Sequence, residues 1–330
     1  MKETGDAPPV RVVFAADELY AIPLTVAIRS LLDHTPMRRG LEIYVLDGGI
    51  DETSKRVVLE SCEGLPRFLS PLPRPLPSVD GALITHITPT TYLRLQLPEL
   101  LPADKVIYLD SDLLVLDDIA ELWALAPDGP PLAGVLDAFL PKGFPALERL
   151  GFGSRGLYFN AGVLVMDLGE MRRSGALTEA AALAGRVQLP FADQDVLNVM
   201  FEKTWHQLPP RWNIQVNRMF NLLGRNTPRF QLDPHPQRAL DEVMARPGIV
   251  HFLGEEKPWH IDGGRLRYAD VWRAVAARTG WRDGLDEYGE RMTLHRMRAN
   301  LGATMRALKE GPQPFDEPTF LARLYEALQR

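Results

Sequence analysis

From Val10 onward, short β-rich runs alternate with longer amphipathic stretches, and this alternation limits the fold more than any other feature of the chain. Parallel strands need a crossover connection, usually a helix, so an alternating order of strands and helices is typical of a parallel sheet. We therefore predict an α/β fold with a mainly parallel central sheet. The predicted strands cover residues 11–16, 41–46, 105–109, 131–136, 162–166 and 248–252, and the predicted helices cover 22–34, 52–62, 91–100, 168–184 and 193–202.

Two segments interrupt this order. Residues 70–78 are rich in proline, which cannot continue a helix or an inner strand, so they predict a surface loop or a lid over a site. Residues 209–236 are expected to be irregular and packed on the main domain. Because the pattern beyond Arg267 is helical, we divide the chain into a main domain, 1–267, and a helical C-terminal appendage, 268–330.

The appendage contains an amphipathic helix with a basic face. Its apolar residues recur at spacings of three and four, with arginines between them. Such a helix can pack on the main domain, form a homodimer interface, or contact an anionic membrane surface. The apolar positions are Leu294, Met297, Leu301, Met305 and Leu308, and the basic positions are Arg291, Arg296, Arg298 and Arg306.

Composition and charge exclude several classes of protein. A formal net charge of −6 and a pI near 5.7 argue against a nucleic-acid partner, because binding to phosphate backbones needs a surplus of Lys and Arg. Cys62 is the single cysteine, so no disulfide can form within the chain. Residues 1–10 lack the apolar core of a secretory signal, and no apolar run reaches the length of a membrane helix. We expect a cytoplasmic protein, either free or peripheral at the inner membrane face.

Four predicted strands are each followed by an aspartate, namely Asp17, Asp47, Asp110 and Asp137. In an open parallel sheet, ligands bind beyond the carboxyl ends of the strands. A single aspartate at such a position is most often a turn or helix-capping residue. Four of them at one edge of a sheet indicate a ligand site instead.

Asp110 and Asp112 are separated by a single residue at the end of a predicted strand. Two neighbouring carboxylates repel each other unless a cation lies between them. Their hard oxygens suit Mg²⁺ or Mn²⁺, and either ion would also neutralise a diphosphate. The pair alone is weak evidence, but another strand end supplies an imidazole, His251, followed by Gly254 and by Lys257, which suits phosphate. The imidazole favours Mn²⁺ over Mg²⁺.

Five short motifs occur in an order that resembles glycosyltransferase family 8. They extend from about Val10 to His260, and an ordered set is far more specific than any single motif. The resemblance is greatest to bacterial lipooligosaccharide α-galactosyltransferases, with glycogenin more distant. The motifs are Phe14–Asp17, Tyr108–Asp112, Asn160–Val163, Asp193–Asn198, and His251–Gly254 followed by Lys257–Trp259.

The resemblance implies a GT-A type nucleotide-sugar-binding fold, a UDP-sugar donor, Mn²⁺, and retention of configuration at the anomeric carbon. Asp110, Asp112 and His251 match the family's metal ligands, and Gly254 and Lys257 match its diphosphate contacts. The other implied donor contacts are Ala15 and Asp17 at the uridine, Ser111 beside the metal ligands, and Arg94, Asp137, Asn160, Asp193 and Gln194 around the sugar.

The resemblance also implies the reaction: transfer of a hexose from UDP-galactose or UDP-glucose to a glycan or another hydroxyl acceptor. Asp193, Gln194 and Asp137 are the expected catalytic residues. Retention by a covalent route needs a carboxylate nucleophile. Because Gln194 is a poor nucleophile and Asp193 could instead accept a sugar hydroxyl, front-face attack is the favoured hypothesis. Leu19 departs from the family pattern, which often has a polar residue at this position to help hold the nucleotide.

Two other classes stay open at this point. The run around Asp110 also resembles the nucleophile strand of Mg²⁺-dependent phosphatases of the haloacid dehalogenase type. Those enzymes prefer Thr or Val where Leu114 stands, and they usually carry this strand near the N-terminus. A non-catalytic nucleotide-sugar-binding protein would have the same ligands without donor turnover.

Overall fold

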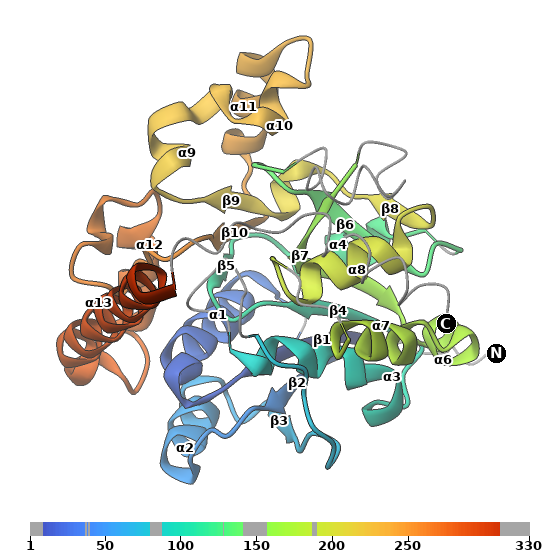
Figure 1. The fold of residues 1–330 in the computed structure, drawn as a ribbon, viewed down its shortest axis with the longest axis horizontal. Coiled ribbons are helices and arrows are strands. Elements are labelled where there is room, and N and C mark those ends of the chain that lie inside the picture. Colours follow the sequence, from blue (N-terminus) through green and yellow to red (C-terminus); the bar gives the residue numbers. More distant parts are fainter. Residues whose placement is uncertain are drawn as a thin grey trace.

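The computed structural model describes residues 9–36, 38, 40–79, 88–127, 129–140, 157–186 and 190–310. Its strands form two sheets (Figure 1). The large sheet has seven strands in the order β3-β2-β1-β4-β7-β6-β8, and the small sheet has three in the order β5-β10-β9. The strands are β1 (Val10–Ala16), β2 (Leu41–Asp47), β3 (Pro66–Leu69), β4 (Lys105–Leu109), β5 (Leu113–Val115), β6 (Leu132–Leu136), β7 (Phe159–Asp167), β8 (Trp205–Gln207), β9 (Ile214–Val216) and β10 (Ile249–Phe252).

The large sheet is mainly parallel, as the sequence predicts. β1 pairs in parallel with both β2 and β4, whereas β7 is antiparallel to both of its neighbours, β4 and β6. Strands β1, β2, β4 and β6 therefore run in the same direction, and their carboxyl ends meet at one edge. Because β7 runs the opposite way, its first residues lie at this same edge.

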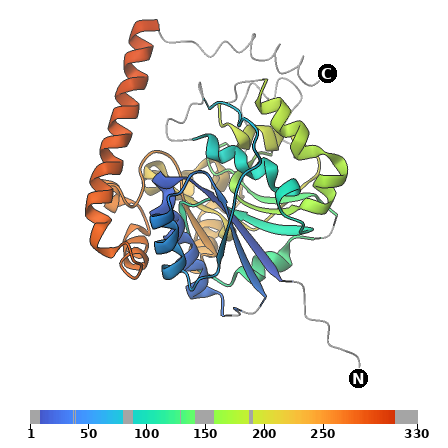
Figure 2. The same ribbon diagram turned by 90° about the horizontal axis from the view of Figure 1, so that it is seen from below.

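Helices cover both faces of the large sheet (Figure 2). Val12 and Phe14 of β1 pack in one apolar cluster with α1 (Ala21–His34) and α2 (Glu52–Ser61). Val13 points to the opposite face and packs with η2 (Pro89–Gln96), α7 (Ala176–Ala184) and α8 (Asp193–Phe201). Burial on both faces explains why the inner strands are apolar without alternation.

The small sheet supports the C-terminal helices. A third apolar cluster joins β9 and β10 to α12 (Ala269–Ala276) and α13 (Leu285–Glu310), and it includes Trp272, Tyr288 and Met292. None of the helices in the described ranges is long and apolar enough to cross a membrane. Residues 311–330 of the predicted appendage lie outside the described residues, as do the side chains of Arg306 and Leu308.

Several elements differ from the prediction. The helix expected over 168–184 is two helices, α6 (Leu168–Ser174) and α7, because Gly175 between them has a φ of +70°. The helix expected over 91–100 is mostly the 3-10 helix η2, followed by α3 (Leu97–Leu100). The segment 209–236 is more ordered than expected, since it contains β9, α9 (Arg218–Leu223) and α10 (Pro228–Gln231) and leads into α11 (Pro236–Ala245). The sequence also gave no signal for β3, β5, β8 and α4 (Ile119–Leu125).

Candidate functional site

A cavity of about 470 Å³ opens at the carboxyl edge of the large sheet. It lies where the chain order reverses between β1 and β4, the position at which open α/β sheets bind ligands. Asp17, Asp110 and Asp137, which follow β1, β4 and β6, all line it. Asp47 does not, because its carboxylate pairs with Lys55 at 2.7 Å and accepts hydrogen bonds from two backbone amides of its own turn. The turn interpretation is therefore correct for Asp47. Asp137 Oδ1 also accepts hydrogen bonds from two amides of its own turn, those of Phe139 and Leu140, but Asp137 lines the cavity as well.

Every other residue that the sequence singles out for the site lines this same cavity. Lining does not by itself assign a role, but it brings together residues that are up to 242 positions apart, from Ala15 to Lys257. The set consists of Ala15, Asp17, Arg94, Asp110, Ser111, Asp112, Asp137, Asn160, Asp193, Gln194, His251, Gly254 and Lys257.

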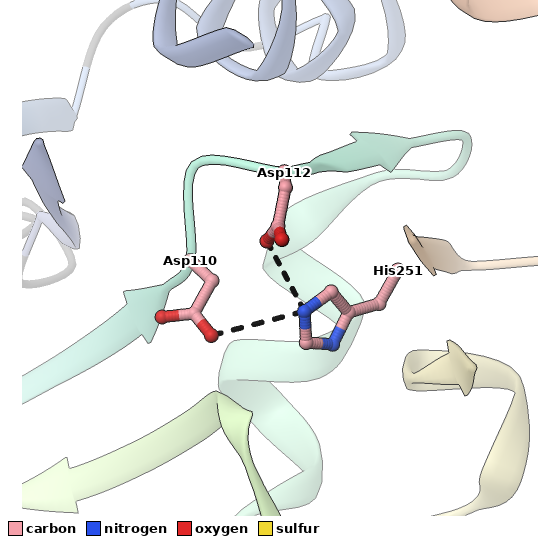
Figure 3. Close-up of side chains that lie close together, drawn as sticks. All are labelled: Asp110, Asp112 and His251. Atoms are coloured by element: carbon pink, nitrogen blue, oxygen red, sulfur yellow. Dashed lines mark ion pairs between the residues drawn. The ribbon is translucent and has the colours of Figure 1, made fainter. Parts of the chain in front are cut away.

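Asp110, Asp112 and His251 point toward one another in the cavity (Figure 3). The His251 Nε2 atom lies 3.2 Å from Asp112 Oδ1 and 3.7 Å from Asp110 Oδ2. One ligand atom from each of the three residues falls within 4.8 Å of the others. Asp110 follows β4 of the large sheet, whereas Asp112 and His251 belong to the small sheet side. Two carboxylates and one imidazole at this spacing fit a divalent cation.

Two further contacts support this fit. Asn213 Oδ1 lies 3.2 Å from His251 Nδ1, and when Nδ1 donates to that oxygen, Nε2 presents a lone pair to the two carboxylates. A cation between these three groups removes their mutual repulsion. Gly162 packs directly against the cluster, since a Cβ atom there would lie 2.6 Å from His251 Nδ1 and 2.8 Å from Asp110 Oδ2.

Two buried cations flank the three residues. Lys257 Nζ donates to Asp112 Oδ2 at 2.6 Å and to the Phe252 carbonyl at 2.6 Å. Arg94 donates a hydrogen bond to Asp110 Oδ1 at 2.7 Å, and it also forms an ion pair with Asp193. Burial alone would raise the pKa of Asp112, but Lys257 and His251 outweigh it and hold that pKa well below its usual range. Asp112 is therefore an anion at any working pH.

The inner end of the cavity is a network of amides and carboxylates. Asn160 Nδ2 and Gln194 Nε2 each donate to Asp137 Oδ2 at 3.3 Å. Gln194 Oε1 accepts from Asn160 Nδ2 at 3.1 Å and from the Ala161 amide at 3.0 Å. These hydrogen bonds fix the orientation of both side-chain amides, so the amides and the Asp137 carboxylate can recognise hydroxyls at defined positions.

Asp193 is a buried carboxylate that is already engaged. Its Oδ2 lies 2.9 Å from Arg94 Nε, and its Oδ1 accepts a hydrogen bond from the Thr91 hydroxyl. Burial raises its pKa, and Arg94 counteracts part of this rise. A carboxylate held by a guanidinium and a hydroxyl is a weakened nucleophile.

At the outer end, Asp17 Oδ2 accepts hydrogen bonds from Thr88 at 2.9 Å and Thr90 at 3.2 Å. Its other oxygen is buried and has no hydrogen-bond partner among the described residues. Ser111 Oγ donates to the Ala15 carbonyl at 2.8 Å, so this hydroxyl ties the end of β4 to the end of β1. Leu19 packs against the third apolar cluster.

Sequence reasoning missed several residues of the site. Thr90 and Thr91 lie in η2 and Thr88 directly precedes it, and their side chains reach the cavity because this 3-10 helix contacts β1. Asn213, which contacts His251, lies directly before β9, a strand that is too short to predict. A Thr-rich run before a buried Arg was the available signal for the first group, whereas Asn213 had none.

The comparison with known proteins decides among the classes of protein. The model described as glycosyl transferase family 8 matches residues 11–263. The chain belongs to glycosyl transferase family 8. This family 8 chain is a glycosyltransferase, and the phosphatase alternative is set aside because the region that matches the family includes the Asp110 segment.

Relatives of this family 8 chain include bacterial proteins and solved structures. General stress protein A of Bacillus subtilis (strain 168) is 31% identical over 288 residues, which cover 82% of this chain and 94% of the relative. Glycosyltransferase GlyF of Streptococcus pneumoniae serotype 4 is 28% identical over 80% of this chain, which spans 63% of that longer protein. The structure of the galactosyltransferase LgtC in complex with donor and acceptor sugar analogs is 29% identical, with a TM-score of 0.65, over 83% of this chain and 99% of that chain.

Proposed function

We propose that this chain transfers a hexose, galactose or glucose, from a UDP-sugar to a carbohydrate or other hydroxyl acceptor, with retention of configuration. Asp110, Asp112 and His251 would hold Mn²⁺, with Mg²⁺ as the alternative. The observation that carries the proposal is the convergence of these three residues with Lys257 in one cavity of a family 8 chain. The solved LgtC complex, which is described as holding donor and acceptor sugar analogs, supports a nucleotide-sugar donor and a carbohydrate acceptor.

The charges of the site suit a leaving diphosphate. A divalent ion bound there supplies a Lewis acid that neutralises the negative charge of the departing nucleotide. Lys257 adds a second cation from the same side, held 2.6 Å from Asp112 and almost wholly buried. Gly254, with a φ of +76°, lets the chain turn sharply between His251 and Lys257 and leaves its own position open toward the cavity.

The inner network suits the donor sugar. Asp137 and Asn160 offer an acceptor and a donor on neighbouring strands, and Gln194 bridges them. Within the described residues, Asp193 is engaged by Arg94 and Thr91, which leaves it better suited to orient a sugar hydroxyl than to form a bond to the anomeric carbon. We therefore favour front-face attack, in which the acceptor approaches from the side that the nucleotide leaves.

The test is a screen of nucleotide sugars with Mn²⁺, Mg²⁺ and a chelator, in which hydrolysis of the donor and thermal stabilisation are measured together. We expect UDP-galactose or UDP-glucose to be turned over with Mn²⁺. Donor turnover by the Asp112→Asn variant should fall about 100-fold or more. Release of phosphate from a generic phosphate ester would contradict the proposal. Binding of UDP without donor turnover would instead indicate a non-catalytic binding protein.

A second variant addresses the mechanism. Under front-face attack, the Asp193→Ala variant keeps measurable turnover, reduced by about 10- to 100-fold because a sugar contact is lost. A covalent role predicts loss of turnover that an external nucleophile such as azide restores. For the location of the enzyme we propose the cytoplasm, at or near a membrane that carries the acceptor.

A further inference from the structure

The segment that carries Lys257 is held as a compact loop, which we call the Lys257 loop and define as residues 254–263. Lys257 O accepts the His260 amide at 3.0 Å, and His260 O accepts the Gly263 amide at 3.0 Å. A Cβ atom at Gly263 would lie 2.8 Å from the Lys257 carbonyl carbon, so the loop closes on itself only with glycine there. Trp259 anchors the loop in the apolar cluster, at 5.3 Å from the ring of Trp272.

One face of α13 contacts this loop over three helical turns. Gly289 allows close approach, since a Cβ atom there would lie 2.6 Å from the Trp259 carbonyl oxygen. Thr293 Oγ1 accepts the Ile261 amide at 3.0 Å, Arg296 binds His260 and Asp262, and Asn300 donates to Glu255 at 2.8 Å. The positions are spaced by four, three and four residues, which places them on one side of a helix. They are Gly289, Thr293, Arg296 and Asn300.

His260 connects this helix to the backbone of Lys257. Its Nδ1 atom lies 3.2 Å from the Lys257 amide, which donates to it, and 3.2 Å from Arg296 Nη1. Both partners are donors, so Nδ1 is an acceptor and the ring is neutral. Arg296 completes the connection through a 2.8 Å ion pair with Asp262 on the far side of the loop.

We propose that Arg296 is a positioning residue for donor binding: through His260 it fixes the backbone of Lys257, so that the lysine ammonium faces the diphosphate of the donor. The inference rests on the proposed function. It makes α13, which lies outside the matched region 11–263, part of the donor site. Apolar burial of Tyr288 and Met292 attaches the start of α13, so the polar contacts of Arg296 are not needed merely to dock the helix.

The experiment compares Arg296→Ala with Arg298→Ala, a matched control on the same helix whose side chain is exposed and forms no hydrogen bond or ion pair with the described residues. Affinities for UDP and for uridine are measured with Mn²⁺, together with kcat and KM for the donor. We expect Arg296→Ala to weaken the affinity for UDP about tenfold and the affinity for uridine less than about twofold, with kcat within about threefold of wild type. Arg298→Ala should match wild type in both affinities, in kcat and in KM.

Two further variants separate positioning from a general loss of structure. His260→Asn keeps an acceptor for the Lys257 amide and should retain UDP affinity, whereas His260→Leu should lose it to the same extent as Arg296→Ala. In a Lys257→Ala background, Arg296→Ala should have no further effect on UDP, because the two residues act on one contact.

Equal losses of affinity for UDP and for uridine in Arg296→Ala would overturn the inference, since they indicate a damaged fold. Additive effects of Arg296→Ala and Lys257→Ala, or unchanged UDP affinity in Arg296→Ala, would overturn it as well. A wild-type protein that does not bind UDP with Mn²⁺ would contradict the proposed function itself. The two failures are therefore distinct.

Discussion

Gly162 packs directly against two of the three candidate metal ligands without being one itself. A side chain there would meet His251 and Asp110 at less than van der Waals distance. Because the first residues of β7 are fixed in the sheet, the ligands have to move instead. We expect Gly162→Ala to lower Mn²⁺ affinity by about 10- to 100-fold, as measured by Mn²⁺ titration of donor turnover. The control is Gly284→Ala, where a Cβ atom meets nothing within 4 Å.

Asp195 predicts a pH dependence of stability. Burial raises its pKa from the usual 3.8 to about 6, although Tyr158 and the Phe191 amide donate to it. The folded state therefore binds a proton that the unfolded state has already released, and the free energy of unfolding falls as the pH rises from about 4 to 6. The effect amounts to at most about 3 kcal/mol.

The Asp195→Asn variant cannot ionise, so its unfolding free energy should lack this fall. Relative to wild type, the variant should gain stability between pH 4.5 and pH 7.5, as measured by urea unfolding at both values. Parallel pH profiles for the two proteins would contradict the assignment. The comparison uses the change with pH, because loss of one acceptor shifts the variant equally at all pH values.

Individual site residues could be predicted where a strand end and a chemical pattern coincide. Asp110, Asp112 and His251 satisfy both conditions, and the structure brings them together. Asp47 satisfies only the first, and Lys55 on the next helix neutralises it. Asn213 satisfies neither, since its contact with His251 depends on the pairing of β9 with β10, which is a tertiary feature.

At the scale of elements, Gly175 separates two helices that the sequence predicts as one. Its φ of +70° is a conformation that residues with a side chain adopt at a cost, and no neighbouring atom lies within 4 Å of an added Cβ. We expect Gly175→Ala to lower the free energy of unfolding by about 1 kcal/mol without affecting donor turnover. Gly185→Ala, at a helix end with a φ of −73°, is the matched control and should be neutral or slightly stabilising.

The long elements could be predicted and the short ones could not. Four strands are mostly apolar on both faces and are therefore visible in the sequence as continuous apolar runs, namely β1, β2, β4 and β6. β5, β8 and β9 have three residues each, which is too few to show a period, and their pairing fixes them as strands. The junction of α6 and α7 was missed because glycine alone does not specify a left-handed backbone.

At the scale of the whole molecule, the outward face of α13 is apolar and basic. Leu294, Met297, Leu301 and Met305 are each about half exposed, and no Asp or Glu occurs between Arg291 and Lys309. Two copies of such a face would repel each other, whereas an anionic membrane would attract it. This charge distribution favours the membrane over the homodimer.

We therefore expect the protein to float with anionic phospholipid vesicles at low salt and to dissociate at high salt. Leu301→Glu should abolish flotation and leave turnover of a water-soluble donor unchanged, because this side chain points away from the Lys257 loop contacts. Equal flotation with zwitterionic vesicles, or none with anionic ones, would contradict a membrane role for α13.

The three predicted ligands come from both sides of a corner in the chain: Asp110 follows β4 of the large sheet, and two residues later Asp112 precedes β5 of the small one. An ion held there would link the two sheets, whose strands β4, β5 and β10 already share one apolar cluster. Such an ion would therefore stabilise the junction between the two sheets as well as the negative charge of the leaving nucleotide.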